Sequence, residues 1–164
     1  YHGLEFDTII LNGSLSKAVG CYGGYTATSH ERLRAICKNS NAYIGSAPLP
    51  PAIAHASIAA LEVIKNGADL RKQLKQNVWT MKEGLRGIGV HTEDSPVPVV
   101  TFVIGDEERN LSIHAELYNR QILIPYIYYP GSPEGGCFRM AVSAQHSESQ
   151  IKNAIDTLGE IINR

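Results

Sequence analysis

The chain of 164 residues lacks a strong charge of either sign and lacks any long apolar run. Its 15 basic and 16 acidic residues leave a formal net charge of −1. There is therefore no excess of positive charge to neutralise nucleic-acid phosphates or to bind an anionic membrane surface. No apolar segment approaches the roughly 20 residues that a membrane-spanning helix needs. We expect neither a nucleic-acid partner nor a membrane.

The sequence also lacks a regular set of cysteines. Cys21, Cys37 and Cys137 are odd in number and widely spaced, and they match neither a zinc-binding spacing nor a disulfide framework. We expect no metal site and a reducing, cytoplasmic setting. The first residues, YHGLEFD, lack the basic and apolar regions of a signal peptide. An apolar strand follows almost at once, so we expect the chain to be a piece of a longer protein.

The hydrophobic pattern predicts an α/β protein in two parts. The first part contains strands at 7–11 and 23–28, a helix at about 30–38 after the cap residue Ser29, an irregular segment at 39–51, and helical chain from about 52 that is punctuated at Asn66 and Gly67. The second part reads strand, helix, strand, strand, helix: 97–104, 108–120, 122–129, 137–144, and a last helix from Ser147 with Gln150 completing a capping box. We place the boundary between residues 75 and 76.

One lysine, Lys17, lies in the glycine-rich stretch LNGSLSKAVGCYGGY that follows the first strand. Most lysines are solvated surface residues. Here, however, the position at a strand's carboxyl end suits a ligand, and the small neighbours allow a flat group or a phosphate to approach closely. Ser14 and Ser16 supply hydroxyls beside it. A phosphate-binding P-loop is excluded because Ala18 follows the lysine, where that motif needs a hydroxyl. A buried lysine instead suits Schiff-base formation with a carbonyl.

Arg139 is the second candidate, in the predicted strand CFRMAVSA. It is either an outward-facing arginine on a half-exposed strand or a clamp for a carboxylate, whose two oxygens match the planar guanidinium. His146 follows in SAQHS, and we interpret it as a hydrogen-bonding residue beside the helix cap. Tyrosines 126, 128 and 129 indicate sheet packing or a subunit contact rather than catalysis.

Three segments together carry a resemblance: FDTIILNGSLSKAVGCYGGYTA, PLPPAIAHASIAALEVI and ILIPYIYYPGSPEGGCFRMAVSAQHSESQI. They resemble the fold-type I pyridoxal-phosphate enzymes and, among these, the α-oxoamine synthase family. The family pattern is an aspartate, an apolar strand, a Ser or Thr three residues before the lysine, and a glycine-rich turn. Asp7, Ser14 and Lys17 match it, and the turn corresponds to residues 20–24.

The resemblance implies a fold and a set of roles. Residues 1–75 would be the end of an aminotransferase-like large domain, and 76–164 a small C-terminal α/β domain. Lys17 would bind pyridoxal 5'-phosphate as a Schiff base and then act as acid and base. Ser14 would bind the cofactor phosphate, and Arg139 the carboxylate of the amino-acid substrate. Ser46 would reach the phosphate of the neighbouring subunit in a homodimer with shared sites.

The implied activity is an acyltransferase that condenses a small amino acid with an acyl-CoA. Two alternatives stay open: another fold-type I enzyme, such as an aminotransferase or a C–C lyase, and a non-catalytic domain that has kept the fold. The family's aspartate for the pyridinium nitrogen and its ring-stacking residue both lie upstream of the lysine, and Asp7 is not that aspartate. We therefore expect this segment alone to be inactive.

Overall fold

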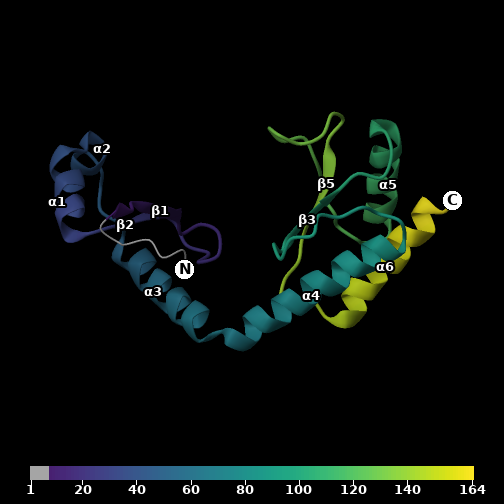
Figure 1. Cartoon of the computed structure of the whole chain (residues 1–164), viewed down its shortest axis with the longest axis horizontal. Coiled ribbons are helices and arrows are strands. Elements are labelled where there is room, and N and C mark those ends of the chain that lie inside the picture. Colours follow the sequence, from purple (N-terminus) through teal and green to yellow (C-terminus); the bar gives the residue numbers. More distant parts are fainter. Residues whose placement is uncertain (1–7) are drawn as a thin grey trace. The chain divides into compact units, whose positions relative to one another are not determined.

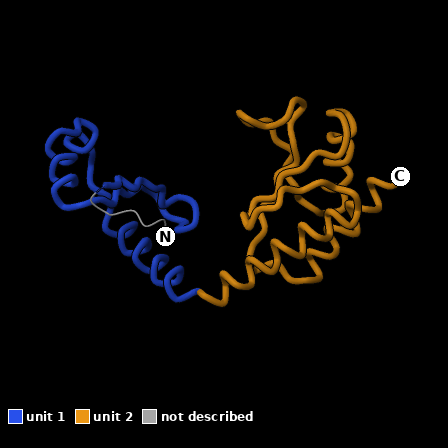
Figure 2. Tube along the Cα trace, viewed as in Figure 1, with its two compact units in different colours: residues 1–67 blue, residues 68–164 orange. Residues whose placement is uncertain are grey.

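The computed structural model describes residues 8–164 and divides the chain into two compact units, residues 1–67 and 68–164 (Figure 2). The division falls at Gly67, between two helices. The domain boundary proposed from the sequence, between residues 75 and 76, lies inside the second of these helices. Asp7 lies outside the described residues.

Residues 8–67 of the first unit form a two-stranded antiparallel sheet and three helices (Figure 1). They are β1 (Leu11–Ser14), β2 (Gly24–Ala27), α1 (His30–Asn39), α2 (Asn41–Ile44) and α3 (Pro51–Asn66). β2, α1 and α3 confirm predicted elements, whereas α2 forms inside the segment predicted to be irregular.

The strand predicted at residues 7–11 was placed too early, because β1 begins at Leu11. β1 pairs with β2, and that ladder runs from Leu11 opposite Ala27 to Ser14 opposite Gly24. Ile9 and Ile10 lie outside the strand, and the Ile9 carbonyl accepts from the hydroxyl of Thr28 at 2.7 Å. Ser29 occupies the N-cap position of α1 as predicted, but its side chain makes no capping hydrogen bond.

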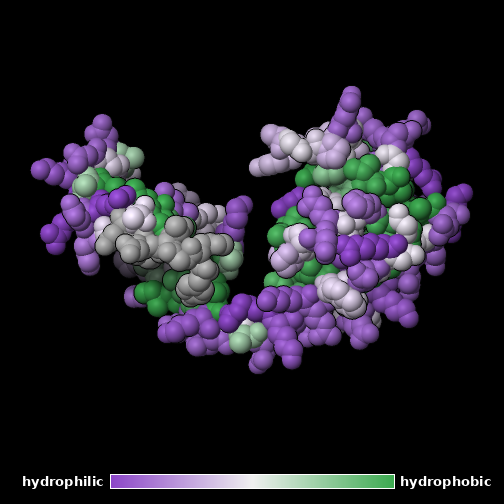
Figure 3. All heavy atoms as spheres, in the orientation of Figure 1, coloured by the Kyte–Doolittle hydropathy of each residue, from purple (hydrophilic) through white to green (hydrophobic). Residues whose placement is uncertain are grey.

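The first unit buries few side chains. Of its described residues only Leu15 and Ser57 are fully buried. Helix α3 begins at Pro51, whose fixed φ suits a first helical turn, and its apolar residues stay exposed, among them Ile58, Leu61 and Val63. Hydrophobic side chains are accordingly visible at the surface over α3 (Figure 3). A helix that is apolar on most of its faces is typical of one covered by further protein.

The second unit has the predicted order of strand, helix, strand, strand and helix after a first long helix (Figure 1). Its elements are α4 (Ala68–Gly87), β3 (Val99–Phe102), α5 (Glu107–Asn119), β4 (Tyr126–Ile127), β5 (Cys137–Ala141) and α6 (Glu148–Ile162). The strands form an antiparallel sheet in the order β3-β5-β4. The capping box predicted at the start of α6 is confirmed, because Ser147 and Gln150 exchange both hydrogen bonds.

One face of this sheet forms a core with all three helices. Phe102 and Phe138 lie opposite each other on β3 and β5, and their rings stack at 5.1 Å with an interplanar angle of 17°. Buried side chains of the helices complete the core: Val78, Met81 and Leu85 of α4, Ile113 and Leu117 of α5, and Ile151, Leu158 and Ile161 of α6. The opposite face of β3 and β5 is exposed at Thr101, Arg139 and Ala141.

Two buried polar side chains on the helices hold the loops at the ends of β3. Lys82 of α4 is 6% exposed, and its ammonium donates to the carbonyl of Glu93 at 3.1 Å and to that of Ser95. Asn110 of α5 accepts from the amides of Ile104 and Gly105, each at 3.2 Å. These bonds satisfy polar groups that would be costly to bury alone.

We expect Lys82→Met to lower the free energy of unfolding by about 2 kcal/mol, because two loop carbonyls lose a charged donor. Urea unfolding followed by circular dichroism measures the loss. Lys75→Met, at an exposed position of the same helix, is the control and should change stability little. Equal losses in the two variants would contradict the role of Lys82.

Candidate functional site

The loop between β1 and β2 has a defined shape set by backbone hydrogen bonds. The amide of Leu15 donates to Gly23 at 2.9 Å, and the amide of Cys21 donates back to Leu15 at 2.8 Å. The amide of Gly20 closes a tight turn onto the carbonyl of Lys17 at 3.0 Å, with Gly20 at φ 68°. Leu15, 8% exposed, anchors the loop. Lys17 therefore begins a closed turn.

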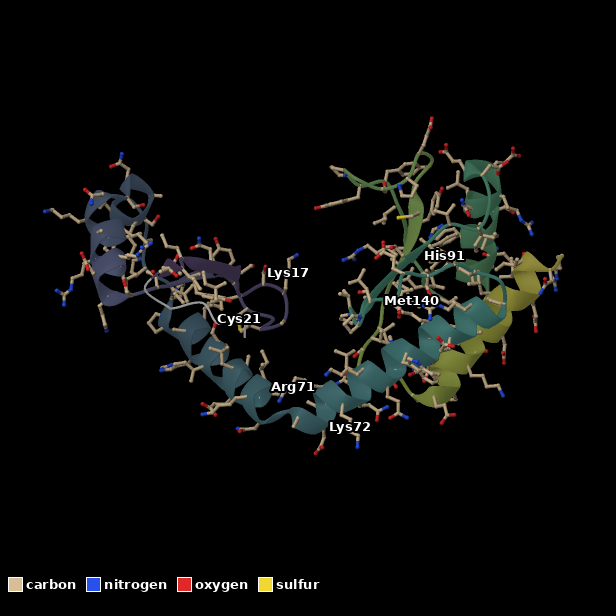
Figure 4. All side chains as sticks on the ribbon, viewed as in Figure 1. Lys17, Cys21, Arg71, Lys72, His91 and Met140 are labelled. Atoms are coloured by element: carbon tan, nitrogen blue, oxygen red, sulfur yellow. The ribbon has the colours of Figure 1, made fainter. Side chains whose placement is uncertain are left out.

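Lys17 extends outward from this loop (Figure 4). Its side chain is exposed, and it forms no hydrogen bond or ion pair with the described residues. The burial expected for a Schiff-base lysine is therefore not present in the described structure. Ser14 and Ser16 are also exposed; their hydroxyl oxygens lie 2.6 Å apart, and the Ser16 amide donates to Ser14 Oγ at 3.1 Å. The loop thus presents an amine and two hydroxyls.

The glycines around this lysine do different things. A Cβ on Gly13 would lie 2.4 Å from Cε1 of Tyr25, its partner across the strand pair, so the tyrosine ring fills the space that a side chain would need. A Cβ on Gly20 would meet nothing within 4 Å. Gly13 thus makes room for Tyr25 and Gly20 permits the positive φ of the turn, and the interpretation that the glycines leave room for a ligand stays a prediction.

Ser46 follows α2 in the same unit. Its hydroxyl donates to the carbonyl of Ala42, and its amide donates to that of Tyr43 at 3.3 Å. The side chain is exposed. Ser46 thus donates hydrogen bonds to two carbonyls of a short helix, and its hydroxyl oxygen can still accept a hydrogen bond.

Arg139 lies on the exposed face of the sheet in the second unit. Its neighbours Phe138 and Met140 are buried, and Thr101 of β3 lies directly opposite it. Its backbone amide donates to Pro125 at 2.8 Å, whereas its guanidinium makes no ion pair or hydrogen bond with described residues. Arg139 is exposed on the strand, as in the first of the two alternatives left open by the sequence, and its role as a carboxylate clamp stays a prediction. The proximity of Thr101 depends on strand register, and no sequence signal indicated it.

The candidate residues thus fall into two groups. Ser14, the last residue of β1, Lys17 in the loop that follows, and Ser46 after α2 belong to the first unit, whereas Arg139 belongs to the second. In the described part of the chain, no cluster of three or more histidine, cysteine and acidic side chains could hold a metal ion. None of the helices between residues 8 and 164 has the length and apolar character to cross a membrane.

His146 and Tyr126 have the roles expected from the sequence, whereas Tyr128 and Tyr129 are exposed. Nδ1 of His146 accepts the amide of Ser143 at 3.2 Å, beside the cap of α6. The ring of Tyr126 packs against Phe138 with centroids 5.1 Å apart. Tyr128 donates its hydroxyl to the Glu107 carboxylate.

Comparison with protein families finds a match over residues 3–158 to the model of aminotransferase class I and II. Curated relatives include the 8-amino-7-oxononanoate synthases of Ectopseudomonas mendocina and Cellvibrio japonicus. Each is 32% identical to this chain, over 98% and 99% of it respectively, and over 42% of its own length. The chain thus spans about two fifths of these relatives.

Solved structures show the same fold. An 8-amino-7-oxononanoate synthase from Francisella tularensis matches 95% of this chain and 46% of its own, with a TM-score of 0.83 and 20% identity. A serine palmitoyltransferase described with its PLP internal aldimine matches 93% of this chain and 39% of its own, with a TM-score of 0.84 and 21% identity. The fold is therefore aminotransferase-like, as expected.

We expect Tyr128 to titrate well above a free tyrosine, because its hydrogen bond to the Glu107 carboxylate raises the pKa of Tyr128 to about 12. The pKa in the folded state lies above the unfolded value of 10.0. The bond therefore stabilises the fold fully below pH 10, and this stabilisation is lost as the pH rises through about 12. The pKa of Tyr128 is measured from the difference in tyrosinate absorbance between the unaltered chain and Tyr128→Phe across a pH titration. In Glu107→Gln the transition should move down toward about 10; no movement would contradict the assignment.

Proposed function

This chain belongs to the family of class I and II aminotransferases, and on that premise we propose that it carries the cofactor lysine and the substrate arginine of a PLP-dependent acyltransferase. The proposed reaction condenses a small amino acid with an acyl-CoA, as the name 8-amino-7-oxononanoate synthase of its curated relatives suggests. The observation that carries the proposal is Lys17, an unpaired amine on a hydrogen-bonded loop after a strand.

The residues of the loop fit pyridoxal 5'-phosphate chemically. Lys17 offers a primary amine for the cofactor's carbonyl, and Ser14, with Ser16 beside it, offers hydroxyl donors for the phosphate. The side chain of Lys17 is exposed and therefore accessible. When bound, the cofactor supplies an electron sink for the carbanion of the amino acid. Lys17 holds the cofactor and then moves a proton at its Nζ atom.

Arg139 is proposed to bind the carboxylate of the amino acid. Its guanidinium is exposed and unpaired among the described residues, and such a group can bind both carboxylate oxygens. A carboxylate held at two points has a fixed orientation, and this orients the bond of the amino acid that breaks in the reaction. Thr101, opposite Arg139 on β3, adds a hydroxyl on the same face.

The proposal includes a cytoplasmic homodimer with shared sites, in which Ser46 serves the neighbouring subunit's phosphate group. The exposed apolar residues of α3 support a partner surface or further chain over the first unit. An aminotransferase or a C–C lyase would use the same lysine and arginine but would need no acyl-CoA. Assays of the full-length enzyme with acyl-CoA against 2-oxo acids separate these activities, and a non-catalytic domain would respond to neither.

We expect Lys17→Ala to abolish the visible absorbance that pyridoxal phosphate gives on the full-length enzyme, because no other amine is expected to form the Schiff base. Absorbance titration with the cofactor measures this. Lys38→Ala, an exposed lysine on α1, is the control and should titrate like the unaltered enzyme. A band that persists in Lys17→Ala would rule out this lysine as the cofactor residue.

We expect Arg139→Ala to raise the Kd of the amino-acid substrate roughly 10- to 100-fold, because a charge-assisted pair of hydrogen bonds is lost. Changes in cofactor absorbance on adding glycine, alanine or serine give the Kd, and cofactor binding should stay unchanged. Arg34→Ala, at an exposed position on α1, serves as control. If Arg139→Ala binds all three amino acids as tightly as Arg34→Ala and the unaltered enzyme do, Arg139 does not bind the carboxylate.

A further inference from the structure

Asn77 of α4 is a buried polar side chain with all its main hydrogen-bonding groups engaged. It is 4% exposed. Its Nδ2 donates to the carbonyls of Ser143 and His146, both at 2.9 Å, and its Oδ1 accepts from Nε2 of Gln73, also at 2.9 Å. The two carbonyls lie 66 and 69 residues farther along the chain. Asn77 therefore joins the first long helix of the unit to a remote segment.

That segment is the turn between β5 and α6, and hydrogen bonds join several of its polar groups to one another. The amide of Ser143 donates to Nδ1 of His146, and the amide of His146 donates back to Ser143 at 3.3 Å. The amide of Gln145 donates to Ser143 Oγ at 3.2 Å. Ser147 then starts the capping box of α6. These bonds restrain the turn, and Asn77 links it to α4.

The turn determines where β5 ends, and β5 carries Arg139. Backbone hydrogen bonds to β3 and β4 prevent β5 from moving sideways in the sheet. Two features oppose the sliding of β5 along its own axis. One is the hydrogen bond from the Val142 amide to the carbonyl of Pro98, just after the strand ends, and the other is the turn that follows. Ser143 is four residues from Arg139, about 13 Å along an extended chain. Movement of the turn is thus transmitted along a short, stiff strand.

We propose that Asn77 is a positioning residue for Arg139: by clamping the β5–α6 turn to α4, it sets the place of the guanidinium that receives the substrate carboxylate. The inference rests on the proposed function, in which Arg139 binds that carboxylate. Gln73 orients the Asn77 carboxamide, because its bond to Oδ1 leaves Nδ2 directed at the turn. The clamp acts on the site without touching the substrate.

The test uses Gln73→Leu in the full-length holoenzyme, because Gln73 is exposed and its replacement opens no cavity. Gln76→Leu, the same change at an exposed position of the same helix, is the matched control. Gln73→Leu should raise the Kd of the amino acid about fivefold, as the loss of one hydrogen bond in the clamp would. Cofactor affinity and melting temperature should match those of Gln76→Leu. Amide hydrogen exchange in residues 142–147 should be faster in Gln73→Leu alone.

Gln73→Lys supplies a rescue, because a lysine four residues before Asn77 can again donate to Oδ1, and it should restore the Kd. Equal Kd values for Gln73→Leu and Gln76→Leu would overturn the inference, as would a rise in Kd accompanied by an equal loss of cofactor affinity and stability. If Arg139→Ala leaves the Kd unchanged, the proposed function itself fails and the inference with it. If Gln73→Leu raises the Kd and Gln76→Leu does not, and Arg139→Ala also raises it, the results support both the proposed function and the inference.

Discussion

The alternation of side chains along β5 is the constraint on which the second unit depends. Phe138 and Met140 face the helices and are buried, so Arg139 must face the other way. A shift of register by one residue would bury the arginine and expose the two core residues, and the stacking of Phe138 on Phe102 opposes it. The same packing that stabilises the core therefore presents an unpaired positive charge on the open face.

Buried polar side chains then determine where the strands end. Lys82 holds the loop before β3, Asn110 holds the turn after it, and Asn77 holds the turn after β5. Each lies on a helix and binds backbone groups of a connecting segment. Hydrophobic packing alone is non-directional, whereas these bonds are specific in geometry. The core thus provides the stability of the sheet, and the three side chains determine its position against the helices.

The first unit is built differently. Its lysine loop takes its shape from backbone hydrogen bonds and from one buried anchor, Leu15, and residues 8–67 bury few other side chains. The apolar residues of α3 remain exposed, and they are the ones that further protein would cover. A reactive amine on such a loop is accessible, and its chemistry depends on what is placed against it.

The sequence by itself determined features that depend on neighbouring residues. Local chemistry predicted the strand that carries Arg139 and the α6 capping box at Ser147, and it singled out the lysine in its glycine-rich turn, because each follows from spacing, side-chain type or strand period. Tertiary structure alone decided the start of β1, the filling of the space at Gly13 by Tyr25, and the partners of Asn77. Each of these requires a contact with a residue distant in sequence, and no local pattern records which distant residue folding will bring near.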